Sequence, residues 1–252
     1  MNIKKITAPL REAWFETSDV RVLRVDARDE FKPGQFYMVG FEGLPGKAMS
    51  VSSSPTKNYL EFTAKLTSSE HKKKWASIQP GEPVHLAGPY GVFTLDETAP
   101  RVCLIAGGIG ITPFKCYLEY ALDKKIPADY LLLYSNRTTQ DMAFSKYLAG
   151  LAAQSSNRLD ASGQQNESPQ NGGSAQKIRV VDTITRLEDG VEWAGRRGRI
   201  DEKMVREEAP DFLERKYYIC GVPQMAKDMA ALLEGMGVEK KLVKREEFTG
   251  LH

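Results

Sequence analysis

The sequence predicts two domains of different class, an antiparallel β-barrel over residues 1–98 followed by a doubly wound parallel α/β domain over residues 99–252. Before Pro100, short apolar runs alternate with turn signals and only one helix is evident. After Pro100, apolar strands alternate with helical segments, which is typical of a parallel sheet covered by helices. A chain of 252 residues is long enough for two such cores.

Short strands rich in branched and aromatic residues are expected to build the first domain. Pro-Gly pairs at 33–34 and 80–81 are typical of turns that lead into strands. We expect strands at 20–25, 36–41, 49–52, 59–66 and 83–87, and one helix at about 69–78.

The second domain is expected to alternate strands at 102–106, 130–134, 178–181 and 217–220 with helices at about 113–124, 141–153, 201–208 and 223–236. Residues 154–176 contain almost no large apolar side chain and are rich in Gln, Asn, Ser and Gly, so they bury too little surface to become ordered. We interpret this segment as an inserted flexible surface loop, with a partner-docking loop as the alternative.

The composition predicts a cytoplasmic globular protein. Hydrophobic residues make up 41% and charged residues 27%, and no apolar run approaches the roughly 20 residues of a membrane helix. The net charge of +2 excludes general binding to nucleic acid or to a membrane surface. The three cysteines, Cys103, Cys116 and Cys220, form no CxxC pair and are expected to be reduced thiols. We therefore expect neither a metal site nor an iron–sulfur domain.

Residues 102–114, VCLIAGGIGITPF, combine a buried strand, a glycine-rich turn and the start of a helix. Glycine lets a backbone adopt positive φ and approach a ligand closely, and a helix N-terminus offers unpaired N–H groups to a pyrophosphate. A proline suits the first helical turn, where its missing N–H costs little. The segment therefore indicates a nucleotide site, and a tight turn in any α/β domain is the alternative. The residues concerned are Gly107, Gly108, Gly110, Thr112 and Pro113.

Residues 47–53, KAMSVSS, resemble the Arg-x-Tyr-Ser-x-x-Ser motif with which members of the ferredoxin–NADP reductase superfamily hold a flavin. Lysine replaces the arginine, so the phosphate contact becomes a point charge instead of a bidentate fork, and methionine replaces the tyrosine. The resemblance implies that Lys47 contacts a phosphate, that Met49 covers one face of the flavin and that Ser50 hydrogen-bonds near flavin N5. It also implies that the flavin-binding strand includes Val51, Ser52 and Ser53. An ordinary strand with serines on its polar face is the alternative.

The next strand and helix continue the resemblance. In the superfamily, a helix at this point directs its N-terminus to the flavin pyrophosphate. Ser68 or Ser69 is expected to cap the helix, and the lysine run 72–74 adds positive charge there. The resemblance therefore implies cofactor contacts by Ala64, Lys65, Ser68, Ser69 and Lys72. A solvated helix face is the alternative for the lysine run.

Two later segments also resemble the superfamily. Cys220-Gly221-Val-Pro223 is similar to its Cys-Gly-Pro-Pro element, and residues 246–250 are similar to the chain end that closes near the flavin. In relatives the Cys-Gly strand end and the threonine of the glycine turn enclose the nicotinamide. The resemblance thus implies Ser50, Thr112 and Cys220 as catalytic residues, with Gly221 and Phe248 as cofactor contacts. Plain burial is the alternative for Cys220 and core packing is the alternative for Phe248.

Arg137 follows the second strand of the α/β domain, where a guanidinium can pair with the 2′-phosphate of NADPH. No acidic residue stands at 135 or 136 to hold a ribose hydroxyl instead, so we expect NADPH to be preferred and NADH to work. Arg196, Arg197 and Arg199 form a second basic cluster, for which a phosphate contact and a solvated surface both remain open.

The resemblance covers nearly the whole chain and implies an FAD-dependent NAD(P)H oxidoreductase. Hydride would pass between the nicotinamide and flavin N5, and single electrons would pass to or from a redox protein such as a ferredoxin, a flavodoxin or a haem protein. Two alternatives stay open. One is a flavin-holding electron-transfer subunit of a larger complex, and the other is a cofactor-poor sensor or assembly module.

Overall fold

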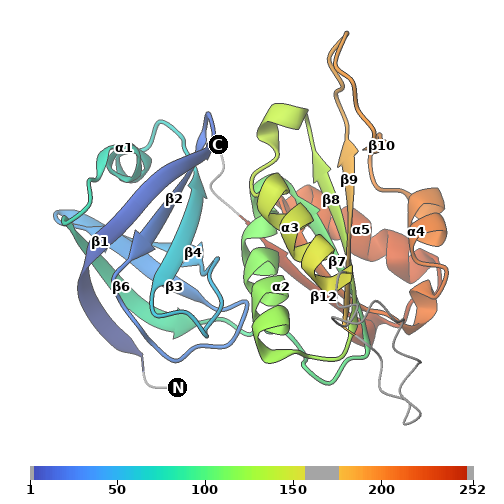
Figure 1. Ribbon diagram of the computed structural model, residues 1–252, viewed down its shortest axis with the longest axis horizontal. Helices are drawn as coiled ribbons and strands as arrows, with labels where there is room; N and C mark the ends of the chain where they lie inside the picture. Colours follow the sequence, from blue (N-terminus) through green and yellow to red (C-terminus); the bar gives the residue numbers. More distant parts are fainter. Residues whose placement is uncertain (1–2, 157–175, 249–252) are drawn as a thin grey trace, which may run out of the picture. The chain divides into compact units, whose positions relative to one another are not determined.

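The computed structural model describes residues 3–156 and 176–248, and these form two six-stranded sheets (Figure 1). The residues group into two compact units. The first contains the described residues before Asp96 together with 109–123 and Phe248, and the second contains 96–108 and the described residues of 124–247. The predicted fold class, an antiparallel barrel-like sheet followed by a parallel α/β sheet, is confirmed.

The sheet of the first unit is antiparallel throughout, with the strand order β4-β3-β6-β1-β2-β5. A single cluster of buried side chains fills its concave side, with Tyr37, Phe62 and Trp75 among the largest members. The elements are β1 (Lys4–Thr17), β2 (Val20–Val25), β3 (Phe36–Phe41), β4 (Leu44–Ser50), β5 (Leu60–Lys65), α1 (Glu70–Ser77) and β6 (Pro83–Tyr90).

Sequence patterns located β2 and β3 to the residue but missed β1 entirely. The register of β1 against β2 shifts between Leu10 and Glu12 and again between Phe15 and Thr17. Each bulge interrupts the alternation of buried and exposed side chains, which is the signal on which a strand prediction depends. The prediction of a strand at 49–52 was also wrong in its bounds, because β4 is an edge strand that tolerates Pro45 and Gly46 inside it.

Helix α1 is fixed to the barrel at its end. Trp75 is fully buried, and the Arg21 guanidinium donates to the carbonyls of Trp75 at 2.9 Å and of Ile78 at 3.0 Å. A cation at the C-terminus of a helix satisfies carbonyls that lack an intrahelical partner. The C-terminal end of α1 is therefore tied to β2.

The sheet of the second unit is parallel throughout, with the order β10-β9-β8-β7-β11-β12. From β7 the chain proceeds outward through β8 and then returns to the other side of β7, so the topological switch point lies between β7 and β11. The strands are β7 (Arg101–Gly107), β8 (Asp129–Asn136), β9 (Lys177–Ile184), β10 (Arg196–Arg197), β11 (Lys216–Gly221) and β12 (Val243–Glu247).

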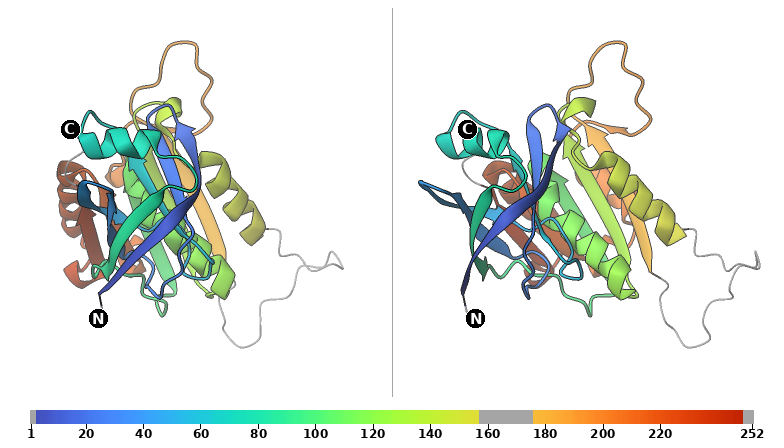
Figure 2. Two further views of the ribbon diagram at one scale, coloured as in Figure 1. Left: turned by 90° about the vertical axis from the view of Figure 1, so that its left-hand side faces the viewer. Right: turned by 60° about the vertical axis from the view of Figure 1, so that its left-hand side comes forward.

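Helices cover both faces of this sheet. Helices α3 (Ser145–Ser156) and α5 (Pro223–Gly235) lie on opposite faces (Figures 1 and 2). Side chains of α5 and of α4 (Glu202–Glu208) share one core with β7, β8 and β11. The predicted start of α3 at 141 was wrong, because Phe144 has a φ of 62° and separates a short 3-10 turn from the helix. Strand β12 was missed because its sequence, VKREE, is polar and only partly buried at the sheet edge.

One further helix bears on the site. Helix α2 (Thr112–Lys124) follows β7 along the chain, and its residues up to Asp123 group with the first unit.

Residues 154–156 belong to α3, so the predicted loop was wrong at its start, and the rest of that prediction, 157–175, lies outside the described residues. Across the described residues, no helix is long and apolar enough to cross a membrane, and no group of His, Cys, Asp and Glu could hold a metal ion.

Candidate functional site

Four serines lie at and just after the end of β4, and their hydroxyls differ in hydrogen bonding. They are Ser50, Ser52, Ser53 and Ser54. The Ser52 hydroxyl donates to Glu61 Oε1 at 2.9 Å and lies 3.0 Å from Thr63 Oγ1. The Ser53 hydroxyl donates to the Tyr59 carbonyl at 3.3 Å. Both hydroxyls are thus occupied within the protein.

Ser50 is the contrast. Its side chain is only 6% exposed, yet no protein group within the described residues hydrogen-bonds its hydroxyl. Its hydroxyl oxygen is not fully shut off from solvent, so a ligand can reach it. Ser50, the predicted flavin contact, is therefore the serine of this segment whose hydroxyl remains available to a ligand.

Lys72 is a cation without a counter-ion. Its Nζ lies 3.7 Å from Met49 Sδ and 5.2 Å from the centroid of the Trp75 ring, and no carboxylate of the described residues pairs with it. Burial lowers the pKa of Lys72 to about 8. The Ser69 hydroxyl caps α1 by accepting from the Lys72 N–H at 3.4 Å, so Ser69 is the N-cap that the sequence left undecided between two serines. Positive potential therefore gathers beside Met49.

The remaining predicted contacts of the first unit vary in their surroundings. Lys47 is exposed on β4, and Ser68 is exposed before the helix cap. Val51 and Ala64 are buried. Lys65 forms an ion pair with Asp19 at 2.8 Å, so its charge is already compensated.

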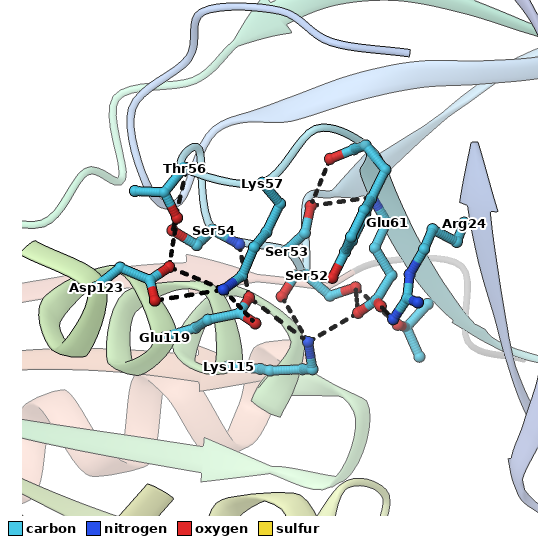
Figure 3. Close-up of polar contacts among 12 residues, drawn as sticks. Arg24, Ser52, Ser53, Ser54, Thr56, Lys57, Glu61, Lys115, Glu119 and Asp123 are labelled. Carbon is cyan, nitrogen blue, oxygen red and sulfur yellow. Dashed lines mark hydrogen bonds and ion pairs between the residues drawn. The ribbon is translucent and has the colours of Figure 1, made fainter. Parts of the chain in front are cut away.

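A cluster of charged and hydroxyl groups joins α2 to the segment 52–57, and sequence analysis missed it. Figure 3 shows Lys115, Glu119 and Asp123 projecting from α2 toward that segment. Lys115 Nζ lies 2.9 Å from Glu61 Oε1 and donates to the Ser52 carbonyl at 3.2 Å. The spacing of four residues along α2 was the available signal, because it places all three side chains on one helix face.

Glu61 and Lys115 form the buried centre of this cluster. Glu61 also accepts from Arg24 Nη2 at 2.9 Å. Burial acts to raise the pKa of Glu61, but the Lys115 charge and the hydrogen bonds from Lys115, Arg24 and Ser52 outweigh it and lower the pKa. Burial likewise acts to lower the pKa of Lys115, and the charges of Glu61 and Glu119 reverse this. Both groups are therefore charged.

In the second unit, two predicted glycines stand at the switch point, at the carboxyl ends of β7 and β11. A Cβ at Gly107 would lie 3.0 Å from Met225 Sδ, and a Cβ at Gly221 would lie 2.8 Å from it. The start of α5 thus packs directly on both strand ends. Gly108 has a φ of +51°, and a Cβ there would meet nothing within 4 Å. The turn is therefore open on the side where a ligand would approach.

Thr112 and Pro113 begin α2 after a 3-10 turn over Gly108–Ile111, which includes Gly110. The Thr112 hydroxyl donates to the Ile109 carbonyl at 2.7 Å, and the residue is almost fully buried. This bond holds the turn in shape at the helix start.

Cys220 and Glu246 are paired across β11 and β12. Burial raises the pKa of Cys220 well above its ordinary value, so the residue is a neutral thiol. Burial also raises the pKa of Glu246 to about 7. Nothing in the sequence marks Glu246 as a buried group, because a surface-like run of charged residues gives no sign of desolvation.

Arg137 lies directly after β8 and is exposed, and its guanidinium has no partner within the described residues. Arg196, by contrast, donates to Glu207 and Glu208 at 2.7 Å each. The second basic cluster is therefore reduced to Arg197 and Arg199, which are exposed.

The predicted site residues divide between the two units. The first unit holds the residues of 47–72, with Gly110, Thr112, Pro113 and Phe248. The second unit holds Gly107, Gly108, Arg137, Cys220 and Gly221.

Comparison with known proteins gives a family. Residues 104–190 and 175–231 match the model of the oxidoreductase NAD-binding domain. The chain is 28% identical over 244 residues to the glycine betaine monooxygenase reductase subunit of Pseudomonas aeruginosa, a match that covers 92% of this chain and 61% of that protein. The chain thus spans about three fifths of the length of the curated relatives it matches.

Two more similarities are informative. A probable dihydroorotate dehydrogenase B electron transfer subunit of Pyrococcus abyssi is 31% identical over 138 residues, covering 53% of this chain and 50% of that protein. The structure of a ferredoxin NADP+ reductase from Neisseria gonorrhoeae, solved with bound FAD and NADP, superposes with a TM-score of 0.75 at 22% identity. That match covers 97% of this chain and 98% of the other, and it shows that the two share their fold.

Proposed function

The chain belongs to the oxidoreductase NAD-binding domain family, within the ferredoxin–NADP reductase superfamily, and on that premise we propose that it is an FAD-dependent NAD(P)H oxidoreductase. FAD, when bound, takes up two electrons as hydride from the nicotinamide and can release them singly. The protein's own task is to bind, orient and exclude water.

The observation that carries the proposal is the pair of unmatched polar groups around Met49. The Ser50 hydroxyl has no protein partner, and the Lys72 ammonium has no carboxylate. The resemblance to the superfamily implies a hydrogen-bond partner near flavin N5 and a cation near the FAD diphosphate. Both requirements fit groups that the folded chain leaves unsatisfied, and Met49 between them offers a polarizable sulfur to an aromatic ring.

The residues of the second unit support a dinucleotide with a pyrophosphate. Ligands of open α/β sheets bind beyond the carboxyl ends of the strands at the switch point, which is where Gly107 and Gly221 lie. Gly108 leaves open space above the turn, so a phosphate can approach the backbone. Arg137 supplies a free guanidinium for the ribose end of the nucleotide.

We assign distinct roles to the three predicted catalytic residues. Ser50 would hydrogen-bond near N5 of a bound flavin, and Thr112 keeps the turn at the start of α2 in shape through its bond to Ile109. Cys220 is fully buried at the end of β11, so its protonated thiol would support the nicotinamide site from beneath and cannot act as a nucleophile.

For the second substrate we propose a one-electron redox protein, such as a ferredoxin, a flavodoxin or a haem protein. The similarity to a reductase subunit of a monooxygenase supports this class of partner. A second candidate is a flavin-holding electron-transfer subunit of a larger complex, which the similarity to the Pyrococcus abyssi subunit favours.

A spectral experiment tests the proposal. The purified protein should be yellow, should release FAD and not FMN on heating, and should be bleached by NADH or NADPH under anaerobic conditions. Rapid bleaching favours the reductase, and flavin that is bound but not bleached favours the subunit. Protein that neither contains FAD nor takes it up from solution would contradict both candidates.

A further inference from the structure

Lys115 is buried where three segments of the first unit meet. Its ammonium is surrounded by oxygens of Glu61 at 2.9 Å, of the Ser52 carbonyl at 3.2 Å and of Glu119 at 3.9 Å (Figure 3). These come from β5, from the segment after β4 and from α2 itself. The side chains of Lys115 and Glu61 are 5% and 0% exposed.

A buried ion pair is weak evidence for stability, because desolvation of both ions offsets their attraction. Apolar residues of similar volume at 61 and 115 would fill the same space without that cost. The pair is therefore better explained by what it positions than by the stability that it adds.

The positioned element is Ser52. Its N–H donates to the Glu61 carbonyl at 2.8 Å, its hydroxyl donates to the Glu61 carboxylate, and its carbonyl accepts from Lys115. Every polar group of Ser52 is thus held. Ser50, only two residues earlier, carries the hydroxyl that has no protein partner.

Lys115 connects Ser52 to the start of α2, the helix that carries Lys115. Lys115 comes three residues after Thr112, in the first turn of the helix that follows the glycine turn. A displacement of the glycine turn would reach Lys115 through the first turn of α2, and Lys115 is hydrogen-bonded to the Ser52 carbonyl.

We propose that Lys115, through Glu61 and the Ser52 carbonyl, is a positioning residue that joins the nucleotide-binding turn to the strand that orients the Ser50 hydroxyl. This inference rests on the proposed function of the site. Lysine suits the position because its compact ammonium directs three donors to oxygens that need not share a plane, whereas the donors of a guanidinium all lie in one plane.

The test compares E61Q/K115M, which removes both buried charges together, with K115R and with the control K57M. Lys57 also pairs with α2, at 3.0 Å from Asp123 and 3.6 Å from Glu119, but it makes no bond to Ser52. Changing both members of the buried pair avoids leaving either of them unpaired, while Arg24 keeps its ion pair with Glu12 and Glu119 keeps its ion pair with Lys57. Circular dichroism and FAD content report whether each variant folds and binds flavin.

The first measurement uses FAD-free protein. Hydrogen–deuterium exchange of peptides covering residues 49–54 should be faster in E61Q/K115M than in the wild type and in K57M. Unchanged exchange would overturn the proposal, and this result does not depend on whether the chain binds FAD.

The second measurement uses FAD-loaded protein. Addition of NAD+, which cannot reduce the flavin, should shift the visible spectrum of the wild type and of K57M, and the shift should be smaller in K115R and E61Q/K115M. The limiting rate of flavin reduction should fall about 10- to 100-fold in these two variants, with little change in nucleotide affinity. Faster exchange combined with a wild-type spectral shift and rate would show that the pair only supports the fold, and would overturn the proposal. Wild-type protein that takes up no FAD would contradict the proposed function instead, and with it the role toward the flavin.

Discussion

The Lys72 ammonium lies 3.7 Å from the sulfur of Met49, and nothing in residues 3–156 or 176–248 neutralises its charge. Its pKa is lowered from 10.5 to about 8 by burial alone. The unfolded chain therefore binds more protons than the folded protein between these two values, so stability rises with pH across that window. Below about pH 8, Lys72 is protonated in the folded protein, which then carries the full free-energy cost of burying this charge.

The first prediction is that K72M stabilises the FAD-free protein at pH 7 by about 1 kcal/mol, after allowance for partial exposure. The gain should shrink between pH 8 and pH 10, because the wild-type lysine loses its proton there. Denaturant unfolding at both pH values measures it, with K73M as the exposed control on the same helix. The same K72M variant should bind FAD about tenfold more weakly if the ammonium contacts the diphosphate. A variant that is less stable at pH 7 would contradict the first effect, and one with wild-type FAD affinity would contradict the second.

The second prediction concerns Ser50, whose hydroxyl is free of protein partners. S50A should keep its FAD and its melting temperature, because no intramolecular hydrogen bond is lost. Flavin reduction should slow by about 10- to 1,000-fold, as expected when one hydrogen bond to the transition state is removed. Stopped-flow bleaching measures the rate. The matched control is S54A, whose hydroxyl contacts Thr56 Oγ1 at 2.7 Å. Equal rates in S50A and S54A would remove Ser50 from the reaction.

The third prediction addresses the choice of nucleotide. R137A should raise the KM for NADPH much more than the KM for NADH, because an unpaired guanidinium can bind a 2′-phosphate bidentately. The NADPH preference of the wild type should diminish at high salt as this pair is screened. R197A, at another exposed arginine of the same unit for which a phosphate contact is also open, is measured alongside to tell the two positions apart. If R137A affects both nucleotides equally, specificity resides elsewhere.

The fourth prediction follows from Glu246, whose pKa burial raises from 4.5 to about 7. Here the folded protein binds more protons than the unfolded chain between these values, so stability is lost as pH rises from 4.5 to 7. E246Q cannot ionise and should be more stable than the wild type at pH 8, by about 1 to 3 kcal/mol, with a smaller difference at pH 5. Urea unfolding at the two pH values tests this. E247Q is the control, because the next residue of a strand faces the other way. A stability difference that does not change with pH would contradict the desolvation of Glu246.

Local patterns were sufficient for much of the fold. Strands β2 and β3, the glycine turn and a serine cap at 68 or 69 could be predicted because periodicity, turn residues and capping residues act over a few neighbouring positions. The order of the superfamily motifs added the two-domain fold class, which the comparisons confirm.

Other features depend on residues that are distant in the chain. The side chains of Ser50, Ser52 and Ser53 are chemically identical, and only the resemblance to the superfamily, not a local signal, singled out Ser50 in the sequence. The fold distinguishes them, since β5 brings Glu61 and the Tyr59 carbonyl to two of the hydroxyls and no protein group to the third.

By itself, then, the sequence determined the classes of the two sheets, the glycine turn and the position of the motif serines, because these are local or ordered along the chain. Tertiary structure alone decided that Lys115 meets Glu61, that Lys72 lacks a carboxylate and that Glu246 is desolvated. The physical reason is that the surrounding groups set both the protonation state of a side chain and whether its polar atoms find partners. Folding brings those groups together from segments that are far apart in sequence.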